Sequence, residues 1–182
     1  MLEYIFLFLV SIISNIFSAL SGGGAGVIQL PAILLLFDIA FINALTVHKI
    51  ATVALGIGAT AKFATKISFD KTLIIQFLLV GVPGVIIGAN IIALTNETLA
   101  RILLGILISS IGIYTIFKKE YGEENRYNNS GNYKIFGLTL VFISGVLNGS
   151  LSAGTGLLFT IILISVYKMD YKNAIAYTLI VV

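Results

Sequence analysis

Ser21-Gly22-Gly23-Gly24-Ala25-Gly26 interrupts an otherwise apolar segment that runs from Ile5 to Phe37. A cluster of glycines does not sustain a helix, because each glycine in a helix interior costs about 1 kcal/mol relative to alanine. In the hydrocarbon core of a membrane, irregular backbone is tolerated only where protein buries it or where it lines a wet cavity. The stretch therefore predicts a broken membrane helix, a frequent device for building ion and substrate sites in secondary transporters.

The composition indicates a membrane protein. The hydrophobic fraction is 58% and the charged fraction is 10%, against about 25% charged residues in soluble domains, and the mean hydropathy is +1.07. The absence of cysteine excludes disulfides and thiolate metal sites. The net charge of +3 is too small to indicate nucleic acid as a partner. A signal peptide is not expected, because the residues before the apolar run include the acidic Glu3 and no Lys or Arg.

A membrane helix needs about 20 mainly apolar residues, and several segments of the chain satisfy this requirement. The predicted fold class is all-α, a polytopic transmembrane helical protein. Full spans are expected over residues 2–20, 42–66, 72–94 and 99–117. Shorter apolar segments are expected at residues 27–37, 135–151 and 157–166, and a further span starts near Asn173.

The chain is predicted to consist of two repeated halves, each opening with a glycine-broken helix. Residues 1–117 form the first transmembrane half, and the polar residues 118–134 form a cytoplasmic linker loop. Residues 135–182 start the second transmembrane half. Since paired interruptions at corresponding positions mark the binding sites of many transporters, we expect the site to lie at the two breaks.

A constant offset of 130 residues relates the two halves without gaps. It carries Gly24 and Gly26 onto Gly154 and Gly156 in the second interruption, Ser152-Ala153-Gly154-Thr155-Gly156. It also carries Asn43 onto Asn173. The breaks and the loops coincide at the same offset, which favours a true internal repeat over chance matches between apolar sequences.

Two topologies fit the sequence. If each broken segment crosses the membrane once, the halves are parallel repeats, the N-terminus is inside, and the basic residues divide seven to four between the two sides. If each segment turns back as a hairpin, the halves are inverted, the N-terminus is outside, and the division is nine to two. Lysine and arginine are enriched in cytoplasmic loops, so the count favours hairpins, and both topologies place the long loop in the cytoplasm.

The breaks supply the first candidate site residues. A helix that starts at Ala25 or Val27 has unpaired N–H groups and a positive dipole end, which together suit an anion. The alternative role for such glycines is close helix packing, which is the favoured interpretation for the Gly84/Gly88 and Gly145/Gly149 pairs. The candidate substrate-binding residues are Ser21, Gly22, Gly23, Gly24, Gly26, Gln29, Asn43, Thr46, His48, Lys49, Asn148, Ser152, Gly154, Thr155 and Gly156.

His48 and Lys49 are ionisable residues within a predicted span, which makes each of them a functional candidate by default. His48 is a candidate carrier of a coupling proton, since histidine titrates near neutral pH. Lys49 is a candidate for balancing the charge of a bound anion. The alternative is that both lie close to the end of the span, where a lysine reaches the membrane interface.

The stretch from Ser21 through the glycine triplet to Pro31, followed by Asn43-Ala44-Leu45-Thr46-Val47-His48-Lys49, resembles the TauE/SafE sulfite-exporter family of membrane transporters. The resemblance implies a carrier for small sulfur-containing anions such as sulfite, sulfonates and sulfoacetate. His48 stands where that family often has asparagine, so the resemblance implies no role for it. Such transporters usually have about two further spans, so the chain is expected to be a fragment, a truncated product or an incomplete sequence.

The sequence therefore predicts a multi-pass transporter of the cell membrane, an exporter or permease for a small anion. The expected partners are that anion, the lipid bilayer, a candidate coupling proton and a second copy of the chain in a homo-oligomer. No cofactor, metal or enzymatic activity is expected, because no nucleophile–base pair or metal cluster is visible. Two alternatives stay open: an anion channel on the same scaffold, and a membrane subunit that does not transport.

Overall fold

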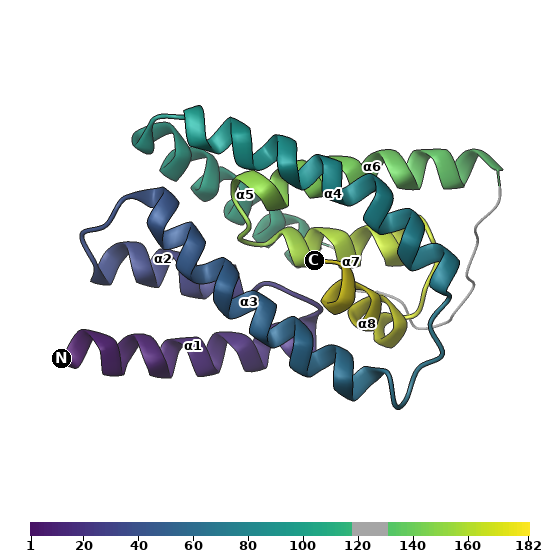
Figure 1. The fold of residues 1–182 in the computed structure, drawn as a ribbon, viewed down its shortest axis with the longest axis horizontal. Helices are drawn as coiled ribbons and strands as arrows, with labels where there is room; N and C mark the ends of the chain where they lie inside the picture. The colour runs from purple at the N-terminus through teal and green to yellow at the C-terminus, as the bar shows by residue number, and fades with distance from the viewer. Residues whose placement is uncertain (118–130) are drawn as a thin grey trace.

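Every regular element in the described part of the chain, residues 1–117 and 131–182 of this computed structural model, is a helix (Figure 1). Four of these helices are long and apolar enough to cross a membrane, namely α1, α3, α4 and α5. The prediction of an all-α, polytopic transmembrane fold is confirmed. The helices are α1 (Leu2–Ser21), α2 (Ala25–Leu36), α3 (Phe41–Phe63), α4 (Lys71–Leu94), α5 (Glu97–Phe117), α6 (Gly131–Ser150), α7 (Thr155–Ser165) and α8 (Tyr171–Val181).

Two helix starts are fixed by aspartate caps. Asp70 precedes α4 and accepts hydrogen bonds from the N–H groups of Thr72 and Leu73 at 2.9 and 3.3 Å. Asp170 precedes α8 and accepts from the N–H of Asn173 at 3.0 Å. Each cap satisfies backbone donors that a helix N-terminus otherwise leaves unpaired.

Two predicted boundaries differ from the structure. Helix α3 ends at Phe63, so Lys66 lies beyond the span that was predicted to include it. Helix α6 begins at Gly131, inside the predicted linker 118–134, and the rest of that linker lies outside the described residues.

Each broken segment turns back on itself as a hairpin. The ring of Tyr4, at the start of α1, packs against that of Phe37, just after α2, with centroids 5.2 Å apart. In the second segment, a Cβ added at Gly137 in α6 would lie 2.6 Å from the hydroxyl of Tyr167, just after α7. The start of the first helix thus lies beside the end of the second in both pairs, and the topology in which each segment crosses once is wrong.

The two hairpins enter from opposite ends of the molecule. The α1–α2 hairpin starts at the end where the N-terminus lies, and the α6–α7 hairpin starts at the other end (Figure 1). Their turns meet between these ends, next to α3 and α8. The arrangement is therefore inverted, and it brings the two sequence breaks into one place.

Helices α4 and α6 pack through facing glycines. A Cβ added at Gly84 would lie 2.6 Å from the carbonyl oxygen of Phe142, and one at Gly145 would lie 2.5 Å from that of Gly81. Such distances leave no room for a side chain, so the small residues let the two backbones touch. The packing role predicted for these glycine pairs is confirmed.

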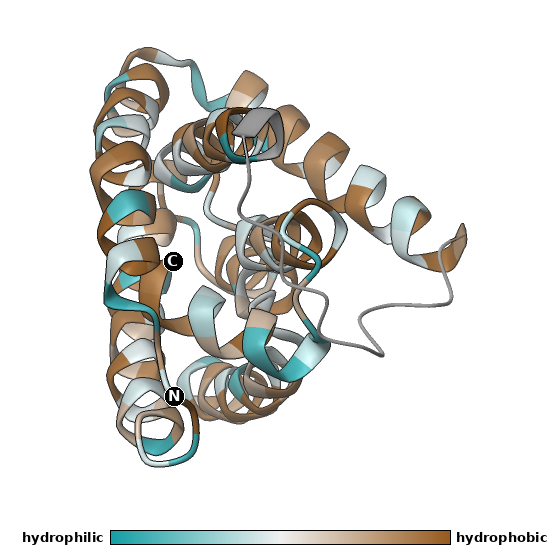
Figure 2. Ribbon diagram, turned by 90° about the vertical axis from the view of Figure 1, so that its right-hand side faces the viewer, coloured by the Kyte–Doolittle hydropathy of each residue, from teal (hydrophilic) through white to brown (hydrophobic). Residues whose placement is uncertain are grey.

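Apolar side chains fill two clusters inside the bundle and also cover its outside. One cluster centres on Phe77, whose ring makes edge-on contacts with Phe159 and Tyr167 at centroid distances of 5.5 and 5.2 Å. The other joins α2, α3 and α5 around Leu30 and Leu45. Hydrophobic residues predominate along the helices (Figure 2), many of them are exposed, and only 11% of the most apolar part of α1 is buried. Such a surface suits contact with lipid.

Candidate functional site

The first break is a turn of three glycines in left-handed conformations. Gly22 ends α1 with φ 77°, Gly23 follows with φ 114°, and Gly24 precedes α2 with φ 106°. The N–H groups of Gly22 and Gly23 both donate to the carbonyl of Ser18, at 3.0 and 2.9 Å, which closes the end of α1. Since residues with a Cβ rarely adopt such angles, the triplet is what allows this turn.

The second break repeats two of these three left-handed positions, and Ala153, which the offset pairs with Gly23, is not left-handed. Gly154 precedes α7 with φ 78°, as Gly24 precedes α2. Ser152 has φ 61°, and it stands at the position that the offset of 130 residues pairs with Gly22. A left-handed conformation costs a non-glycine residue about 1–2 kcal/mol. The hydroxyl of Thr155 lies 2.6 Å from the carbonyl of Ser152 and supports the turn.

The two breaks touch through their backbones. A Cβ added at Gly23 would lie 2.5 Å from the Cα of Gly156, and one at Gly156 would lie 2.8 Å from the Cα of Gly23. The hydroxyl of Thr160 in α7 donates to the carbonyl of Gly22 at 2.8 Å and lies 2.8 Å from the hydroxyl of Thr178 in α8. The second half therefore holds the turn of the first half directly.

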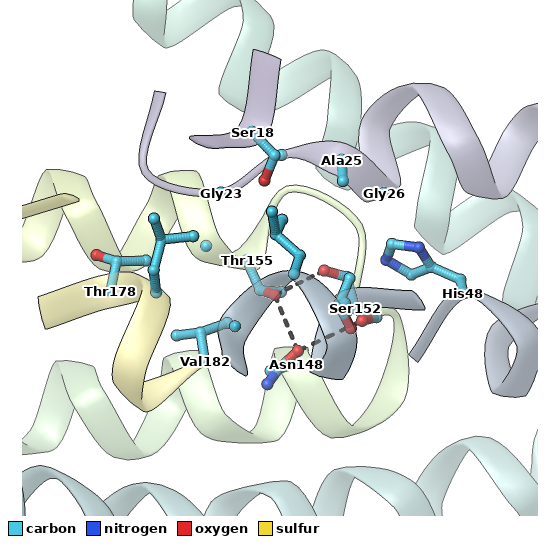
Figure 3. A pocket seen from close by; sticks show the side chains of 16 residues that line it. Ser18, Gly23, Ala25, Gly26, His48, Asn148, Ser152, Thr155, Thr178 and Val182 are labelled. Carbon is cyan, nitrogen blue, oxygen red and sulfur yellow. Dashed lines mark hydrogen bonds between the residues drawn. The ribbon is translucent and has the colours of Figure 1, made fainter. Parts of the chain in front are cut away.

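A cavity of about 50 Å³ lies between the breaks (Figure 3). One water-sized group needs about 10–15 Å³ of such volume, so the cavity has room for a few of them. The N-terminal turns of α2 and α7 surround it together with α3, α6 and α8. The residues that line it are Ser18, Gly23, Gly24, Ala25, Gly26, His48, Thr52, Leu55, Gly56, Asn148, Ser152, Thr155, Gly156, Thr178, Leu179 and Val182.

Polar groups from both breaks face this cavity. The side-chain oxygen of Asn148 lies 3.1 Å from the hydroxyl of Thr155 and 3.4 Å from that of Ser152 (Figure 3). The N–H groups of Gly26 and Gly156, in the first turns of α2 and α7, donate to no backbone acceptor among the described residues. Because helix N–H groups point toward the N-terminal end, both helices direct donors and positive dipole ends to the breaks.

His48 enters the cavity from α3. It is 1% exposed, and its Nδ1 lies 2.7 Å from the side-chain oxygen of Gln29 in α2. A Cβ added at Gly26 would lie 2.6 Å from Nε2 of His48 and 2.7 Å from the Cα of Ala153, so Nε2 lies between the two breaks. His48 is therefore an interior residue, and the expectation of a position near the interface does not hold for it.

The structure brings eight of the fifteen predicted site residues to the cavity wall and uses others to shape the turns. Ser21 donates to the carbonyl of Gly23 at 2.6 Å, and Gly22 and Gly154 form the turns themselves. Gln29 contacts the cavity only through His48. The eight are Gly23, Gly24, Gly26, His48, Asn148, Ser152, Thr155 and Gly156.

Three predicted residues lie away from the cavity. Lys49 extends to α6 and donates to the main-chain carbonyl of Asn148 at 2.7 Å, close to the C-terminal end of that helix. Asn43 and Thr46 are exposed, and the hydroxyl of Thr46 donates to the carbonyl of Ile42 in its own helix. Neither Asn43 nor Thr46 belongs to the site that we describe.

Several cavity residues escaped the sequence analysis. Ser18 lies one turn before the first break, and Thr52 lies one turn after His48. Helical spacing from the predicted residues would have found both. The offset of 130 residues carries His48 onto Thr178, so applying the predicted repeat to His48 would have indicated this residue.

No group of three or more His, Cys, Asp and Glu residues lies together in residues 1–117 and 131–182. The geometry defines a class of protein, a polytopic membrane protein with two oppositely directed helix hairpins and a polar cavity at their turns. The family model of sulfite exporter TauE/SafE matches residues 7–182, and the chain belongs to this family.

The curated relatives are named as membrane proteins. The chain is 27% identical over 172 residues to the "Probable membrane transporter protein" of Haemophilus influenzae, a match that covers 94% of this chain and 66% of that protein. It is 24% identical over 173 residues to "Probable membrane transporter protein ORF9" of Sinorhizobium sp, a match that covers 95% of this chain and 65% of that protein.

A third relative is "Probable membrane transporter protein YfcA" of Escherichia coli K12, 29% identical over 142 residues, covering 76% of this chain and 49% of that protein. The chain thus spans less than two thirds of the length of each of these relatives. No solved structure matches it.

Proposed function

We propose that this chain forms the substrate-binding part of a secondary transporter that carries sulfite, a sulfonate or a related small sulfur oxyanion across the plasma membrane. The observation that carries the proposal is the meeting of two glycine breaks around one small polar cavity. The family description names sulfite, and the relatives are named as membrane transporters. We extend both to this chain as part of the proposal.

The anion is held by dipoles in this proposal. Each helix N-terminus is equivalent to about half a positive charge, and the N-termini of α2 and α7 both point at the breaks. The N–H groups of Gly26 and Gly156 supply donors. The hydroxyls of Ser152 and Thr155 already donate to the side-chain oxygen of Asn148, which leaves the side-chain nitrogen of Asn148 as a further donor in the wall. Such a site can bind an anion although no lysine or arginine is among the described residues of the wall. The cavity volume of about 50 Å³ is compatible with a group as small as sulfite.

Transport follows from the inverted arrangement of the hairpins. In transporters with inverted repeats, one half rocks against the other around a fixed central site. Here that movement separates Gly22 from Thr160 and lets the cavity face each side in turn. The internal repeat itself stays a prediction, which the matching helix starts at Ala25 and Thr155, and at Phe41 and Tyr171, support.

The hairpin topology and the distribution of basic residues together favour one membrane orientation. It corresponds to the nine-to-two division of basic residues, with the nine on the cytoplasmic side and the N-terminus outside. The nine are Lys62, Lys66, Lys71, Lys118, Lys119, Arg126, Lys134, Lys168 and Lys172, and the two are Lys49 and Arg101.

The test is the thermal stabilisation of the purified chain by sulfite, with methanesulfonate, phosphate and acetate as further probes. Asn148→Leu removes an amide from the cavity, and we expect it to abolish the shift in unfolding temperature that sulfite produces. Asn90→Leu is the matched control, because Asn90 is exposed and donates to the carbonyl of Ile86 in its own helix. The same measurement on the longer Haemophilus influenzae relative tests whether its additional residues are needed.

A shift in both proteins that Asn148→Leu removes and Asn90→Leu keeps supports the proposal. A shift in the longer relative alone means that the part of the site described here is insufficient. Stabilisation by phosphate or acetate but not by sulfite contradicts the sulfur substrate, and equal shifts in the two asparagine variants contradict the position of the site.

A further inference from the structure

Gln29 was expected to donate a hydrogen bond to the substrate, but its contacts assign it a different task. We infer that Gln29 is a positioning residue that fixes the tautomer of His48, so that Nε2 is the nitrogen that exchanges a proton with the cavity. The inference rests on the proposed function, because it concerns the only titratable side chain among the described residues that line the proposed anion site.

The contacts of Gln29 form a chain from α1 to the cavity. Its side-chain nitrogen donates to the hydroxyl of Ser11 in α1 at 2.9 Å, which leaves the side-chain oxygen to face Nδ1 of His48 at 2.7 Å. That oxygen has no proton to give, so Nδ1 carries the hydrogen. Gln29 is 3% exposed and His48 is 1% exposed, so water does not compete for this bond.

A rotated amide is the alternative arrangement. It would let Ser11 donate to Gln29 and Gln29 donate to Nδ1, and His48 would then carry its hydrogen on Nε2. The serines of α1 argue against it. Ser14 and Ser21 each donate to main-chain carbonyls of this helix or its turn, which leaves their oxygens as acceptors. A hydroxyl of Ser11 used in the same way accepts from Gln29.

The consequence is that one space serves both proton and anion. A neutral His48 with hydrogen on Nδ1 offers the lone pair of Nε2 to the region between Gly26 and Ala153. When His48 takes up a second proton there, the bond from Nδ1 to Gln29 is kept, so protonation requires no rearrangement of the helices. The positive charge then lies beside the proposed anion. The adjacent residue in the chain, Lys49, is also charged, and its ammonium group donates to the main-chain carbonyl of Asn148.

The chain offers a direct experiment because it contains one histidine. Nitrogen-15 NMR of histidine-labelled protein in nanodiscs reports which ring nitrogen carries the hydrogen, without signals from other histidines. In the neutral form we expect Nδ1 to be protonated and Nε2 to be unprotonated. Gln29→Leu leaves Nδ1 without an acceptor, and we expect the ratio of the two tautomers to change about tenfold or more in favour of Nε2–H.

The matched control is Gln76→Leu, the same substitution at a partly buried glutamine of α4 whose side-chain oxygen has no hydrogen-bond partner among the described residues. We expect it to leave the tautomer ratio unchanged. A wild-type protein with its hydrogen on Nε2, or equal ratios in the two leucine variants, would overturn the inference. The tautomer of His48 in the wild-type protein tests the inference even if Gln29→Leu fails to fold.

Addition of sulfite separates this inference from the proposed function. If sulfite occupies the cavity, the Nε2 signal moves more than the Nδ1 signal. A wild-type Nδ1–H tautomer whose two signals do not respond to saturating sulfite supports the positioning role and contradicts the anion site. A shift of Nε2 that Gln29→Leu reduces supports both.

Discussion

The contact between Gly23 and Gly156 gives a quantitative prediction for the substitution Gly23→Ala. The backbone of Gly23 has φ 114°, a conformation that costs a residue with a Cβ about 1–3 kcal/mol. The new methyl group would also lie 2.5 Å from the Cα of Gly156, and overpacking of this kind costs about 1–3 kcal/mol because the main chain itself must move. The two effects together amount to about 2–6 kcal/mol.

This strain should appear in anion binding, because the proposed site needs the two breaks in contact. If the breaks separate in the unbound variant and must close to bind, even about 2 kcal/mol weakens the affinity about 30-fold. Gly24→Ala should be milder. Its φ of 106° is also unfavourable, but its methyl group would meet only the flexible end of Leu157, at 2.9 Å.

Sulfite titration into detergent-purified protein measures the affinity, and thermal unfolding without sulfite measures the stability. The matched control is Gly105→Ala in α5, where a Cβ meets nothing within 4 Å and a helical alanine is favourable by up to about 1 kcal/mol. We expect the order of affinities Gly105→Ala, then Gly24→Ala, then Gly23→Ala. A folded Gly23→Ala variant that binds sulfite as tightly as Gly105→Ala would refute the role of the break contact.

Three further substitutions test the packing around the site. Gly145→Ala sets a methyl group against the carbonyl of Gly81 and should lower the stability by about 1–3 kcal/mol, seen as a lower unfolding temperature, while folded molecules keep their sulfite affinity. Thr160→Val removes the donor to Gly22 and should cost about 1–3 kcal/mol, whereas Thr160→Ser should be close to wild type, and equal unfolding temperatures for the two variants would contradict this. Asp170→Ala removes the cap of α8 and should lower the stability by about 1 kcal/mol, with faster amide hydrogen exchange in the first turn of that helix. Asp170→Asn keeps a capping oxygen and should largely retain the wild-type exchange rate.

The helices could be predicted because their signals are local. Apolar length, glycine clusters and aspartate caps act within a few residues, and the predicted arm at 27–37 corresponds to α2, Ala25–Leu36. The start of α6 at Gly131 was missed because polar residues near a membrane interface do not distinguish a helical turn from a loop. The choice between crossing and hairpin depended on two lysines, whereas the ring contact of Tyr4 with Phe37 decides it.

The candidate site was predictable only as far as the breaks define it. Glycine at positions 23 and 156 indicates an unusual backbone, but the contact between them joins residues far apart in the chain. The direction of a side chain on a helix also depends on its neighbours. Lys49 follows His48 directly, yet it reaches the end of α6 while His48 faces the cavity. Neither destination can be derived from one sequence without the packing of α3 against the second half.

A left-handed glycine precedes α2 and α7 alike, at Gly24 and Gly154, but the side chains behind the two helix starts differ. The buried pair behind the first helix start is Gln29 with His48, and the pair behind the second is Thr160 with Thr178. Threonines do not change charge, so His48, beside the first helix start, is the titratable side chain among the described residues that line the cavity. His48→Thr removes the titratable contact, and Thr178→His creates one on the other side of the cavity. The double variant that exchanges the two side chains should still bind the anion, but the dependence of its affinity on pH should differ from that of the wild type. Binding that depends on pH identically in wild type and His48→Thr would show that His48 does not couple the proton.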